Sequence, residues 1–407
     1  MIKGLVGEKL GHSFSKVIHE KLTDGIYNLY SLNKDEFNDF FENKKFDFVN
    51  VTIPYKEEVK KYLDYISDAA EEIGAVNLVI NKAGKLYGYN TDYYGFMNML
   101  KYNNVDVEGK NCLILGTGGT SKTVKKALSD MGANNVYKAS RNKSKDFIGY
   151  DEVYDYNIDL IINTTPVGMY PNIDGCIIDI TKFSNVEAVV DVVYNPLKTR
   201  LLIEAEKNGI KIVNGLLMLV LQAVKAVEIV NNFEVSREKV FEIYNDLLSE
   251  KRNIVLIGMP GCGKTTIGER LSADLNKEFI DIDKMIEADN GMKISYIFEN
   301  YGEKHFRDLE TESSLKVGLL NGKVISTGGG VIKNYKNIQF LKSNGLIIYI
   351  KRDIKDIILD DNRPLSKNIS DLEELYKERK KLYESYADVI VENNATIIDV
   401  VNKIKLL

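Results

Sequence analysis

Short apolar runs alternate with longer stretches in which apolar residues recur every three or four positions, along nearly all of the 407-residue chain. Apolar residues at helical spacing predict amphipathic helices, whereas short uninterrupted runs predict buried strands. The predicted strands are residues 47–53, 111–116, 134–140, 158–164, 187–194, 253–258, 323–329 and 346–352. Strands that alternate with helices are typical of parallel sheets, so the pattern predicts an α/β protein.

One charged stretch divides this pattern. Residues 232–252, NFEVSREKVFEIYNDLLSEKR, have the spacing of an amphipathic helix and predict a domain boundary near residue 251. The part that follows has the size of one ordinary domain. The part before it corresponds to one large domain or to two small ones.

Composition and charge narrow the class of protein. The chain is 44% hydrophobic and 28% charged, with a formal net charge of −5, which is normal for a globular protein and argues against a nucleic-acid-binding surface. The N-terminus lacks the apolar core of a signal peptide. The longest apolar run, residues 215–224, is about half of a membrane span. We therefore expect a cytoplasmic protein with neither nucleic acid nor a membrane as a partner.

Cysteine and histidine are too few and too scattered for a metal site built on them. The chain has Cys112, Cys176 and Cys262, far apart and odd in number, and its histidines are His12, His19 and His305. This arrangement provides no disulfide framework and no zinc-ligand spacing. Any metal should be held by oxygen atoms, which points to magnesium bound together with phosphates.

A phosphate-binding loop follows the predicted strand at 253–258. The sequence GMPGCGKTT, residues 258–266, fits the pattern G-x-x-x-x-G-K-[ST] and precedes a helical stretch. Its glycines allow backbone N–H groups to approach nucleotide phosphates, Lys264 supplies charge and Thr265 can bind magnesium. The alternative is a plain glycine-rich turn, but the order strand, loop, Lys-Thr and helix favours a nucleotide.

Two further segments contain candidates for the phosphate acceptor site. In FIDIDKMIE, Asp281 and Asp283 alternate with apolar residues at a predicted strand end, so both side chains should point the same way. One carboxylate can reach magnesium while the other accepts a proton from a substrate hydroxyl. In FENYGEKHFRDLE, Arg307 lies at helical spacing from Glu303 and Glu310 and can bind a carboxylate. The alternative for either segment is a solvated charged surface.

Together these segments resemble shikimate kinase over residues 253–407. The shared segments are GMPGCGKTT, DID, FRDLE, STGGG, NRPL and RKKLYESYAD. The resemblance implies that Asp283 holds the ring hydroxyls and acts as the base. It implies that Arg363, on a lid, neutralises the transferred phosphate. In the lid Asp360 and Asp361 precede Arg363 where the family often has basic residues, so the adenine contacts stay open.

The same resemblance implies roles for a larger set of residues. Arg307 and Arg379 would bind the carboxylate of shikimate, and Thr265 and Asp281 would bind Mg²⁺. Backbone would approach the substrate ring at Gly328, Gly329 and Gly330. The ATP-binding residues would be Gly258, Gly261, Cys262, Gly263, Lys264, Thr265 and Thr266.

A second nucleotide motif lies in the first part of the chain. Residues 111–128 read as a strand, a glycine turn and a helix, with Gly116 and Gly118 in the first two positions of G-x-G-x-x-G and Ser121 in the third. The next predicted strand ends before Arg141. A carboxylate there would favour NAD, whereas an arginine accommodates the extra phosphate of NADP. The alternative for Arg141 is a surface residue.

Reduction of a ketone requires a proton donor for the new alkoxide. Lys56, in NVTIPYKEEV, and Asp92, in GYNTDYYGF, are the candidates upstream of the glycine turn. Taken alone, a lysine in a charged stretch is usually solvated, and an aspartate after a turn usually caps a helix.

Residues 1–250 as a whole resemble shikimate dehydrogenase. The segments that carry the resemblance are GHSFSKVIH, NVTIPYKE, GAVN, NTDYYGF, GTGGTS, NTTPVGM, DVVYNPLKT and NGLLMLVLQA. The resemblance implies a substrate-binding α/β domain over residues 1–100. A Rossmann domain for NADP would follow over residues 101–250, with final helices that pack back on the first domain. The kinase domain would then occupy residues 252–407.

The resemblance also implies site residues. Lys56 and Asp92 would be the catalytic pair. Substrate hydroxyls and carboxylate would be held by Ser13, Ser15, Thr52, Asn77 and Gln222, with Tyr194 nearby. NADP(H) would be held by Gly116, Gly118, Gly119, Arg141 and the segment 163–169, which includes Asn163, Thr164 and Met169.

Five positions depart from the family pattern. The family usually has Pro, Asn and Thr where Lys16, Glu20 and Leu78 stand, and none of these bears on catalysis. Its nucleotide signature is commonly Asn-Arg-Thr, whereas this chain has Ser-Arg-Asn at 140–142. The strictness of NADP over NAD therefore stays open.

The sequence as a whole predicts a bifunctional enzyme of the shikimate pathway. It would reduce 3-dehydroshikimate with NADPH and then phosphorylate shikimate from ATP. One alternative is a quinate dehydrogenase joined to a kinase for another polyol. The other is a non-catalytic first part that senses dinucleotide or shikimate and regulates the kinase. Oligomeric state and transfer of product between the sites are left open.

Overall fold

The computed structural model describes residues 1–11, 14–357 and 369–407. The chain divides into two compact units. The first unit comprises Met1–Met169, Cys176–Asn195 and Glu204–Leu247. The second comprises Tyr170–Gly175, Pro196–Ile203 and Leu248–Leu407.

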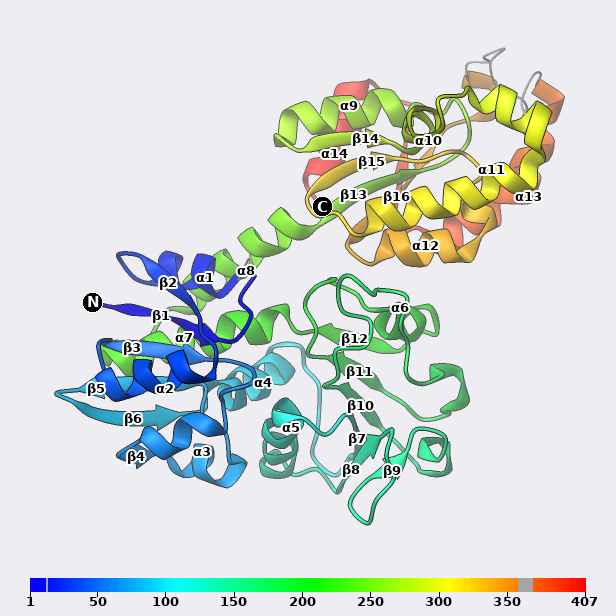
Figure 1. Cartoon of the computed structure of the whole chain (residues 1–407). Coiled ribbons are helices and arrows are strands. Elements are labelled where there is room, and N and C mark those ends of the chain that lie inside the picture. Colours follow the sequence, from blue (N-terminus) through cyan, green and yellow to red (C-terminus); the bar gives the residue numbers. More distant parts are fainter. Residues whose placement is uncertain (12–13, 358–368) are drawn as a thin grey trace. The chain divides into compact units, whose positions relative to one another are not determined.

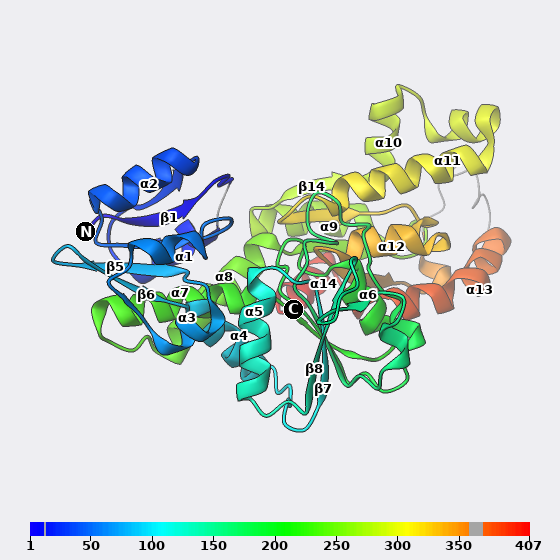
Figure 2. The same ribbon diagram turned by 60° about the horizontal axis from the view of Figure 1, so that its bottom comes forward.

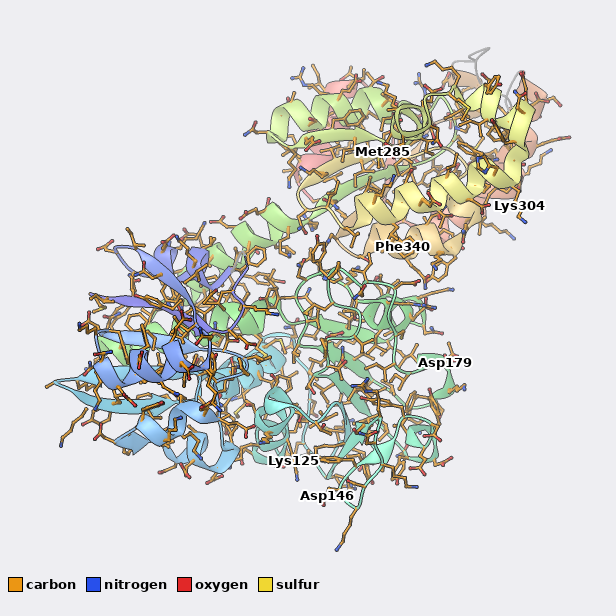
Figure 3. All side chains as sticks on the ribbon, viewed as in Figure 1. Lys125, Asp146, Asp179, Met285, Lys304 and Phe340 are labelled. Carbon is orange, nitrogen blue, oxygen red and sulfur yellow. The ribbon has the colours of Figure 1, made fainter. Side chains whose placement is uncertain are left out.

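Figure 3 shows the charged side chains of Lys125, Asp146, Asp179 and Lys304 on the outside of the ribbon, where each is exposed.

The first unit begins with a mixed sheet in the order β2-β1-β3-β5-β6-β4 (Figure 1). Its strands are β1 (Lys3–Gly7), β2 (Tyr27–Ser31), β3 (Phe48–Val51), β4 (Tyr65–Ile66), β5 (Leu78–Lys82) and β6 (Lys85–Tyr89). The accompanying helices are α1 (Phe14–Leu22), α2 (Lys34–Asn43), α3 (Asp68–Ile73) and α4 (Thr91–Tyr102).

Strand β5 departs from the parallel pairing that is typical of α/β proteins. Strand β5 pairs antiparallel with both β3 and β6. Only Ala83 and Gly84 connect β5 to β6, with φ of 53° and 85°. A two-residue connection of positive φ makes a tight hairpin, which forces antiparallel strands. The Asn81 side chain supports the turn by accepting a hydrogen bond from Gly84 N at 2.8 Å.

The second sheet of the first unit is entirely parallel, in the order β12-β11-β10-β7-β8-β9. This is the Rossmann order, in which the chain leaves the central strand first on one side and then on the other. The strands are β7 (Asn111–Leu115), β8 (Asn135–Ser140), β9 (Ile148–Gly149), β10 (Leu160–Asn163), β11 (Ala188–Asp191) and β12 (Lys211–Asn214). The neighbouring helices are α5 (Gly119–Asp130) and α6 (Arg200–Lys207).

Two long helices follow this sheet, α7 (Leu216–Asn231) and α8 (Arg237–Lys251). Helix α7 contacts α1 and α4 (Figure 1 and Figure 2). Ala226, Ile229 and Val230 of α7 pack into the same apolar cluster as Leu5 and Phe48 of the first sheet. The apolar run at residues 215–224 is therefore part of a helix that stabilises the first sheet. Among the described residues, no helix combines the length and the apolar character needed to cross a membrane.

The second unit contains a parallel sheet in the order β14-β15-β13-β16-β17. Its strands are β13 (Asn253–Ile257), β14 (Glu278–Asp281), β15 (Lys323–Ser326), β16 (Gly345–Lys351) and β17 (Val389–Glu392). Its helices are α9 (Lys264–Leu275), α10 (Ile282–Asn290), α11 (Ile294–Gly318), α12 (Tyr335–Lys342), α13 (Ile369–Tyr386) and α14 (Ile397–Lys405). The central strands are buried on both faces, as Val255, Ile325 and Ile348 show.

Candidate active sites

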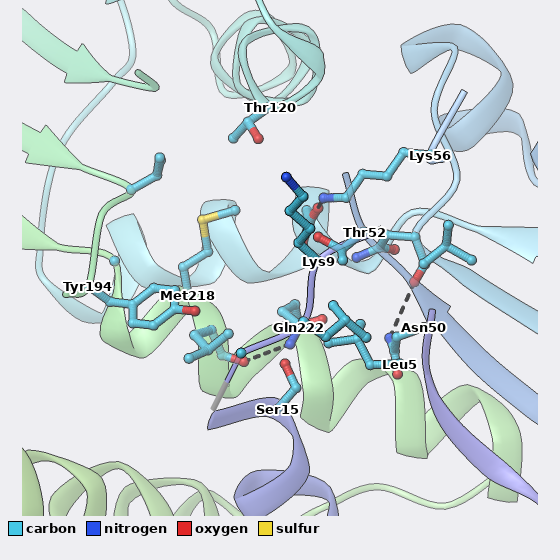
Figure 4. Close-up of a pocket in the computed structure, with 18 residues that line it drawn as sticks. Leu5, Lys9, Ser15, Asn50, Thr52, Lys56, Thr120, Tyr194, Met218 and Gln222 are labelled. Atoms are coloured by element: carbon cyan, nitrogen blue, oxygen red, sulfur yellow. Dashed lines mark hydrogen bonds and ion pairs between the residues drawn. The ribbon is translucent and has the colours of Figure 1, made fainter. Parts of the chain in front are cut away.

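Residues predicted to bind the substrate of the first unit line one cavity of about 360 Å³ (Figure 4). The cavity lies among the first sheet, α7 and the N-terminal end of α5. The predicted residues that line it are Ser15, Thr52, Lys56, Asn77, Asp92, Tyr194 and Gln222. Ser13 lies outside the described residues. The fold therefore brings together side chains that are far apart in the sequence.

Lys56 and Asp92 form an ion pair in this cavity. Lys56 Nζ lies 2.6 Å from Asp92 Oδ2, and the two side chains are 19% and 13% exposed. Helix α4 is capped by Asn90, which accepts a hydrogen bond from Tyr93 N, so Asp92 is not the helix cap that the alternative interpretation made it. A charge pair that is mostly shielded from water interacts more strongly than one at the surface.

A buried network of amide side chains supports the cavity floor. Asn77 Oδ1 accepts a hydrogen bond from Thr91 N at 2.6 Å, and Gln222 Nε2 donates to Leu219 O at 2.9 Å. Asn50 Nδ2 donates to Asn77 O at 3.3 Å, while its Oδ1 accepts from Tyr27 Oη at 2.8 Å. Asn50 and Thr91 lie in the segments NVTIPYKEEV and GYNTDYYGF, but the sequence analysis gave neither of them a role.

The glycine turn after β7 leaves the N-terminus of α5 open. Gly116 has φ of 104°, and a Cβ atom there would lie 2.8 Å from Thr165 Cγ2. A Cβ on Gly118 or Gly119 would meet no atom within 4 Å. A phosphate can therefore approach the backbone N–H groups at this helix end, as in a dinucleotide site. Ser121, in the third motif position, is buried and donates to Gly118 O at 2.7 Å.

The segment after β10 lies beside this turn, because β10 is the other neighbour of β7. Asn163 is buried and donates to Asp191 Oδ2 at 3.0 Å, and Thr164 Oγ1 donates to Leu115 O at 2.7 Å. These two side chains hold the segment in place, while Met169 is exposed. Arg141 is exposed directly after β8, the strand on the opposite side of β7.

In the second unit the predicted phosphate loop connects β13 to α9. Gly258, Gly261 and Gly263 all have positive φ, of 148°, 78° and 101°. Lys264 Nζ donates to Gly258 O and to Met259 O, each at 3.0 Å. The loop thus closes around the lysine, and its backbone conformation is one that residues with a Cβ rarely adopt.

The structure corrects the expected geometry of Asp281 and Asp283. Strand β14 ends at Asp281, and Asp283 lies in the first turn of α10, so the two do not alternate along one strand. Asp281 Oδ1 caps α10 by accepting from Asp283 N at 3.1 Å. Its Oδ2 accepts from Thr265 Oγ1 at 3.0 Å. The capping preference of aspartate ends the strand here, and two oxygen donors lie together beside the phosphate loop.

Asp283 faces Glu310 across Gly328. A Cβ atom on Gly328 would lie 2.7 Å from Asp283 Oδ1 and 3.1 Å from Glu310 Oε1. Both oxygens are buried without a hydrogen-bond partner among the described residues. Burial, and then the neighbouring Asp281, raise the pKa of Asp283 to about 6. Burial likewise raises the pKa of Glu310 to about 7, against the opposing effect of Arg307.

Two arginines complete this cluster. Arg307 binds Glu303 Oε1 at 3.0 Å and Glu310 Oε2 at 2.9 Å, and its guanidinium occupies the space that a Cβ on Gly330 would need. Arg379 is 2% exposed and donates from Nη1 to Gly329 O at 3.0 Å. Its Nε and Nη2 are buried without a hydrogen-bond partner among the described residues. Buried, unsatisfied donors of this kind suit an anionic ligand.

The N-terminal part matches known proteins closely. Residues 5–79 match the family model described as shikimate dehydrogenase substrate binding domain. The NADP(+) shikimate dehydrogenase of Clostridium perfringens (strain ATCC 13124) is 45% identical over 263 residues, which make up 60% of this chain and 97% of that relative. The chain belongs to the shikimate dehydrogenase family.

Solved structures of shikimate dehydrogenases agree with this assignment. A chorismate mutase/shikimate 5-dehydrogenase fusion protein from Clostridium acetobutylicum is 40% identical, with a TM-score of 0.58 over 60% of this chain and 96% of that one. The shikimate 5-dehydrogenase of Thermus thermophilus, solved in complex with NADP(H) and shikimate, is 28% identical, with a TM-score of 0.55 over 60% of this chain and 99% of that one.

Residues 260–406 match the family model described as shikimate kinase. The chain is therefore a shikimate dehydrogenase joined to a shikimate kinase domain, which confirms the predicted fusion and the predicted α/β architecture. The individual site residues stay predictions. Arg363, with the neighbouring Asp360 and Asp361, lies outside the described residues.

Glu310, like Glu303, is a charged residue beside Arg307 that the sequence analysis noticed without giving it a role. Its spacing of three residues from Arg307 placed both side chains on one helix face. That spacing is the same for a solvated pair and for a buried one. Burial distinguishes the two cases, and it depends on the packing of α11 against the glycines after β15.

We predict that Glu310→Gln makes the stability of the shikimate kinase domain less dependent on pH. The pKa of Glu310, raised to about 7 from 4.5, means that the folded state holds the proton more tightly than the unfolded chain. This contribution to stability is fully present below about pH 4.5 and is lost as the pH rises toward about 7, by at most ~1.4 kcal/mol per pH unit. Unfolding by denaturant at several pH values measures it.

The matched control is Glu312→Gln, which removes an exposed carboxylate from the same helix. It should leave the slope of the unfolding free energy against pH unchanged. The same slope in the parent chain and in Glu310→Gln would contradict the raised pKa.

Proposed function

We propose that the chain reduces 3-dehydroshikimate to shikimate with NADPH and phosphorylates shikimate to shikimate 3-phosphate with ATP. The observation that carries the first reaction is the Lys56–Asp92 pair at 2.6 Å, in a cavity that also reaches the N-terminal turn of α5. Two assays test the proposal: loss of NADPH absorbance on adding 3-dehydroshikimate, and ADP release on adding shikimate and ATP. A chain that binds NADPH but does not oxidise it would support the sensor instead.

In the reduction, Lys56 donates a proton to the oxygen that becomes the new hydroxyl. Asp92 keeps the ammonium in place and accepts a hydrogen bond from a substrate hydroxyl. Bound NADPH supplies the hydride. Ser15, Thr52, Asn77 and Gln222 orient the substrate from the cavity walls. General acid catalysis by a positioned group of this kind contributes about 10²–10⁴ to the rate.

In the phosphorylation, Asp283 accepts the proton of the attacking hydroxyl. Arg379, with two unsatisfied donor atoms, and Arg307 bind the carboxylate of shikimate. Lys264 leaves the loop carbonyls to bind ATP phosphates, and the predicted role of Arg363 is to neutralise the transferred group. Thr265 Oγ1 and Asp281 Oδ2, 3.0 Å apart, are the hard oxygen donors that Mg²⁺ prefers, and Mg²⁺ would offset phosphate charge there.

The proposal includes three domains, over residues 1–100, 101–250 and 252–407. The separate sheets β1–β6, β7–β12 and β13–β17 support this division. We also propose a cytoplasmic location, since the cytoplasm supplies both NADPH and ATP.

We predict that the two activities separate by mutation. Lys56→Ala removes the proton donor, so reduction should fall about 10²–10⁴-fold while phosphorylation persists. Lys264→Ala should abolish phosphorylation and spare reduction, because each set of residues is complete within its own unit. Both assays on each purified variant measure this. Loss of both activities in either variant, with the fold intact, would contradict it.

We predict that Arg141→Asp raises the KM for NADPH more than the KM for NADH. The arginine is exposed at the end of β8, where the 2′-phosphate of NADP binds in this fold. A carboxylate there repels that phosphate, and it accepts hydrogen bonds from the ribose hydroxyls of NADH. Steady-state kinetics with both cofactors provides the measurement, and equal increases would show that Arg141 does not bind the 2′-phosphate.

We predict that Asp283→Asn abolishes phosphoryl transfer and leaves ATP binding largely intact. Asparagine keeps the size of the side chain but cannot accept the hydroxyl proton, while the phosphate loop still holds the nucleotide. Turnover is compared with ATP affinity from equilibrium titration. A loss of affinity as large as the loss of rate would assign Asp283 to the metal instead.

A further inference from the structure

The substrate cavity of the first unit has one positive charge that the proposed reduction does not use. Its charged lining residues are Lys9, Lys56 and Asp92. Lys56 and Asp92 compensate each other at 2.6 Å. Among the residues that the structure describes, Lys9 has neither a hydrogen bond nor an ion pair. Among the described lining residues the net charge is therefore positive, and its source is the exposed Lys9.

Lys9 belongs to the loop between β1 and α1. In Figure 4 its side chain extends away from Ser15 and Gln222 and toward the side of the cavity where Lys56 and Thr120 lie. Thr120 is the second residue of α5 and marks the place where the N-terminal turn of that helix reaches the cavity. In a Rossmann domain the diphosphate of the dinucleotide binds at this helix end.

The basic residue in the first turn of α5 is already paired. Lys122 Nζ lies 2.7 Å from Glu57 Oε1. The helix end thus offers backbone N–H groups, but the positive charge of Lys122 is offset by a neighbouring carboxylate. A diphosphate carries about two negative charges, and a charge-assisted contact is stronger than a neutral one.

We propose that Lys9 binds the diphosphate of the dinucleotide from the loop that faces the α5 N-terminus. The inference rests on the proposed NADPH-dependent reduction and adds a residue from the substrate-binding sheet to the cofactor site. Since NADPH and NADH share the diphosphate, Lys9 contributes equally to the binding of both. Arg141, in contrast, distinguishes them.

The test is Lys9→Gln in the full chain, with dinucleotide affinity measured from NADPH and NADH fluorescence and with steady-state kinetics. We expect the Kd and KM of both cofactors to rise by the same factor, about tenfold. The KM for 3-dehydroshikimate and kcat should change less than about twofold. Lys9→Arg should restore affinity. Added salt should weaken NADPH binding more steeply in the parent chain than in Lys9→Gln.

The matched control is Lys45→Gln, which removes an exposed lysine of the same sheet region outside the cavity and should leave all constants unchanged. A rise confined to the KM for 3-dehydroshikimate would overturn the proposal in favour of the substrate carboxylate. A rise confined to NADPH would overturn it by assigning Lys9 to the 2′-phosphate. Unchanged constants would overturn it by leaving Lys9 a surface residue. Fluorescence titration measures cofactor affinity even if the chain does not reduce 3-dehydroshikimate. It therefore distinguishes failure of this proposal from failure of the proposed reduction.

Discussion

Each nucleotide site depends on a glycine whose backbone lies so close to neighbouring atoms that no side chain would fit. In each of these two parallel sheets, the strand that comes first in the sequence is followed by a glycine of positive φ. These glycines are Gly116 after β7 and Gly258 after β13. A Cβ on Gly116 would lie 2.8 Å from Thr165 Cγ2, and one on Gly258 would lie 2.6 Å from Ile350 O. Only glycine lets the chain turn there into a helix whose N-terminus can receive a phosphate.

The two candidate substrate sites differ in the charged side chains that they contain and in how deeply these are buried. In the first unit Lys56 and Asp92 compensate each other, and Lys9 adds a positive charge to the same cavity. In the second, Asp283 and Glu310 each bring one buried oxygen to Gly328, and burial raises their pKa values to about 6 and about 7. Arg307 and Arg379 offset part of that cost, since an unpaired buried charge is strongly unfavourable.

The sequence predicted the elements whose signals are local. Apolar runs located the central strands, and glycine patterns located both phosphate-binding turns. The segments that resemble the family identified Lys56, Asp92, Asn77 and Gln222, and the fold brings these residues into one cavity. It did not predict the hairpin at Ala83–Gly84, whose backbone conformation reverses the strand direction. Nor did it predict the burial of Glu310 or the support that Asn50 gives to the cavity, because both depend on packing between distant segments.

The proposed reactions place opposite demands on one oxygen atom. Reduction at position 3 of the ring creates a hydroxyl that must gain a proton, and phosphorylation at position 3 requires the same hydroxyl to lose one. The chain meets these demands with different side chains in different surroundings. In the proposed reduction, the Lys56 ammonium held by Asp92 gives the proton. In the second, burial raises the pKa of the Asp283 carboxyl, and a carboxylate with a raised pKa is a stronger base. The environment of each group thus sets the direction in which the proton moves.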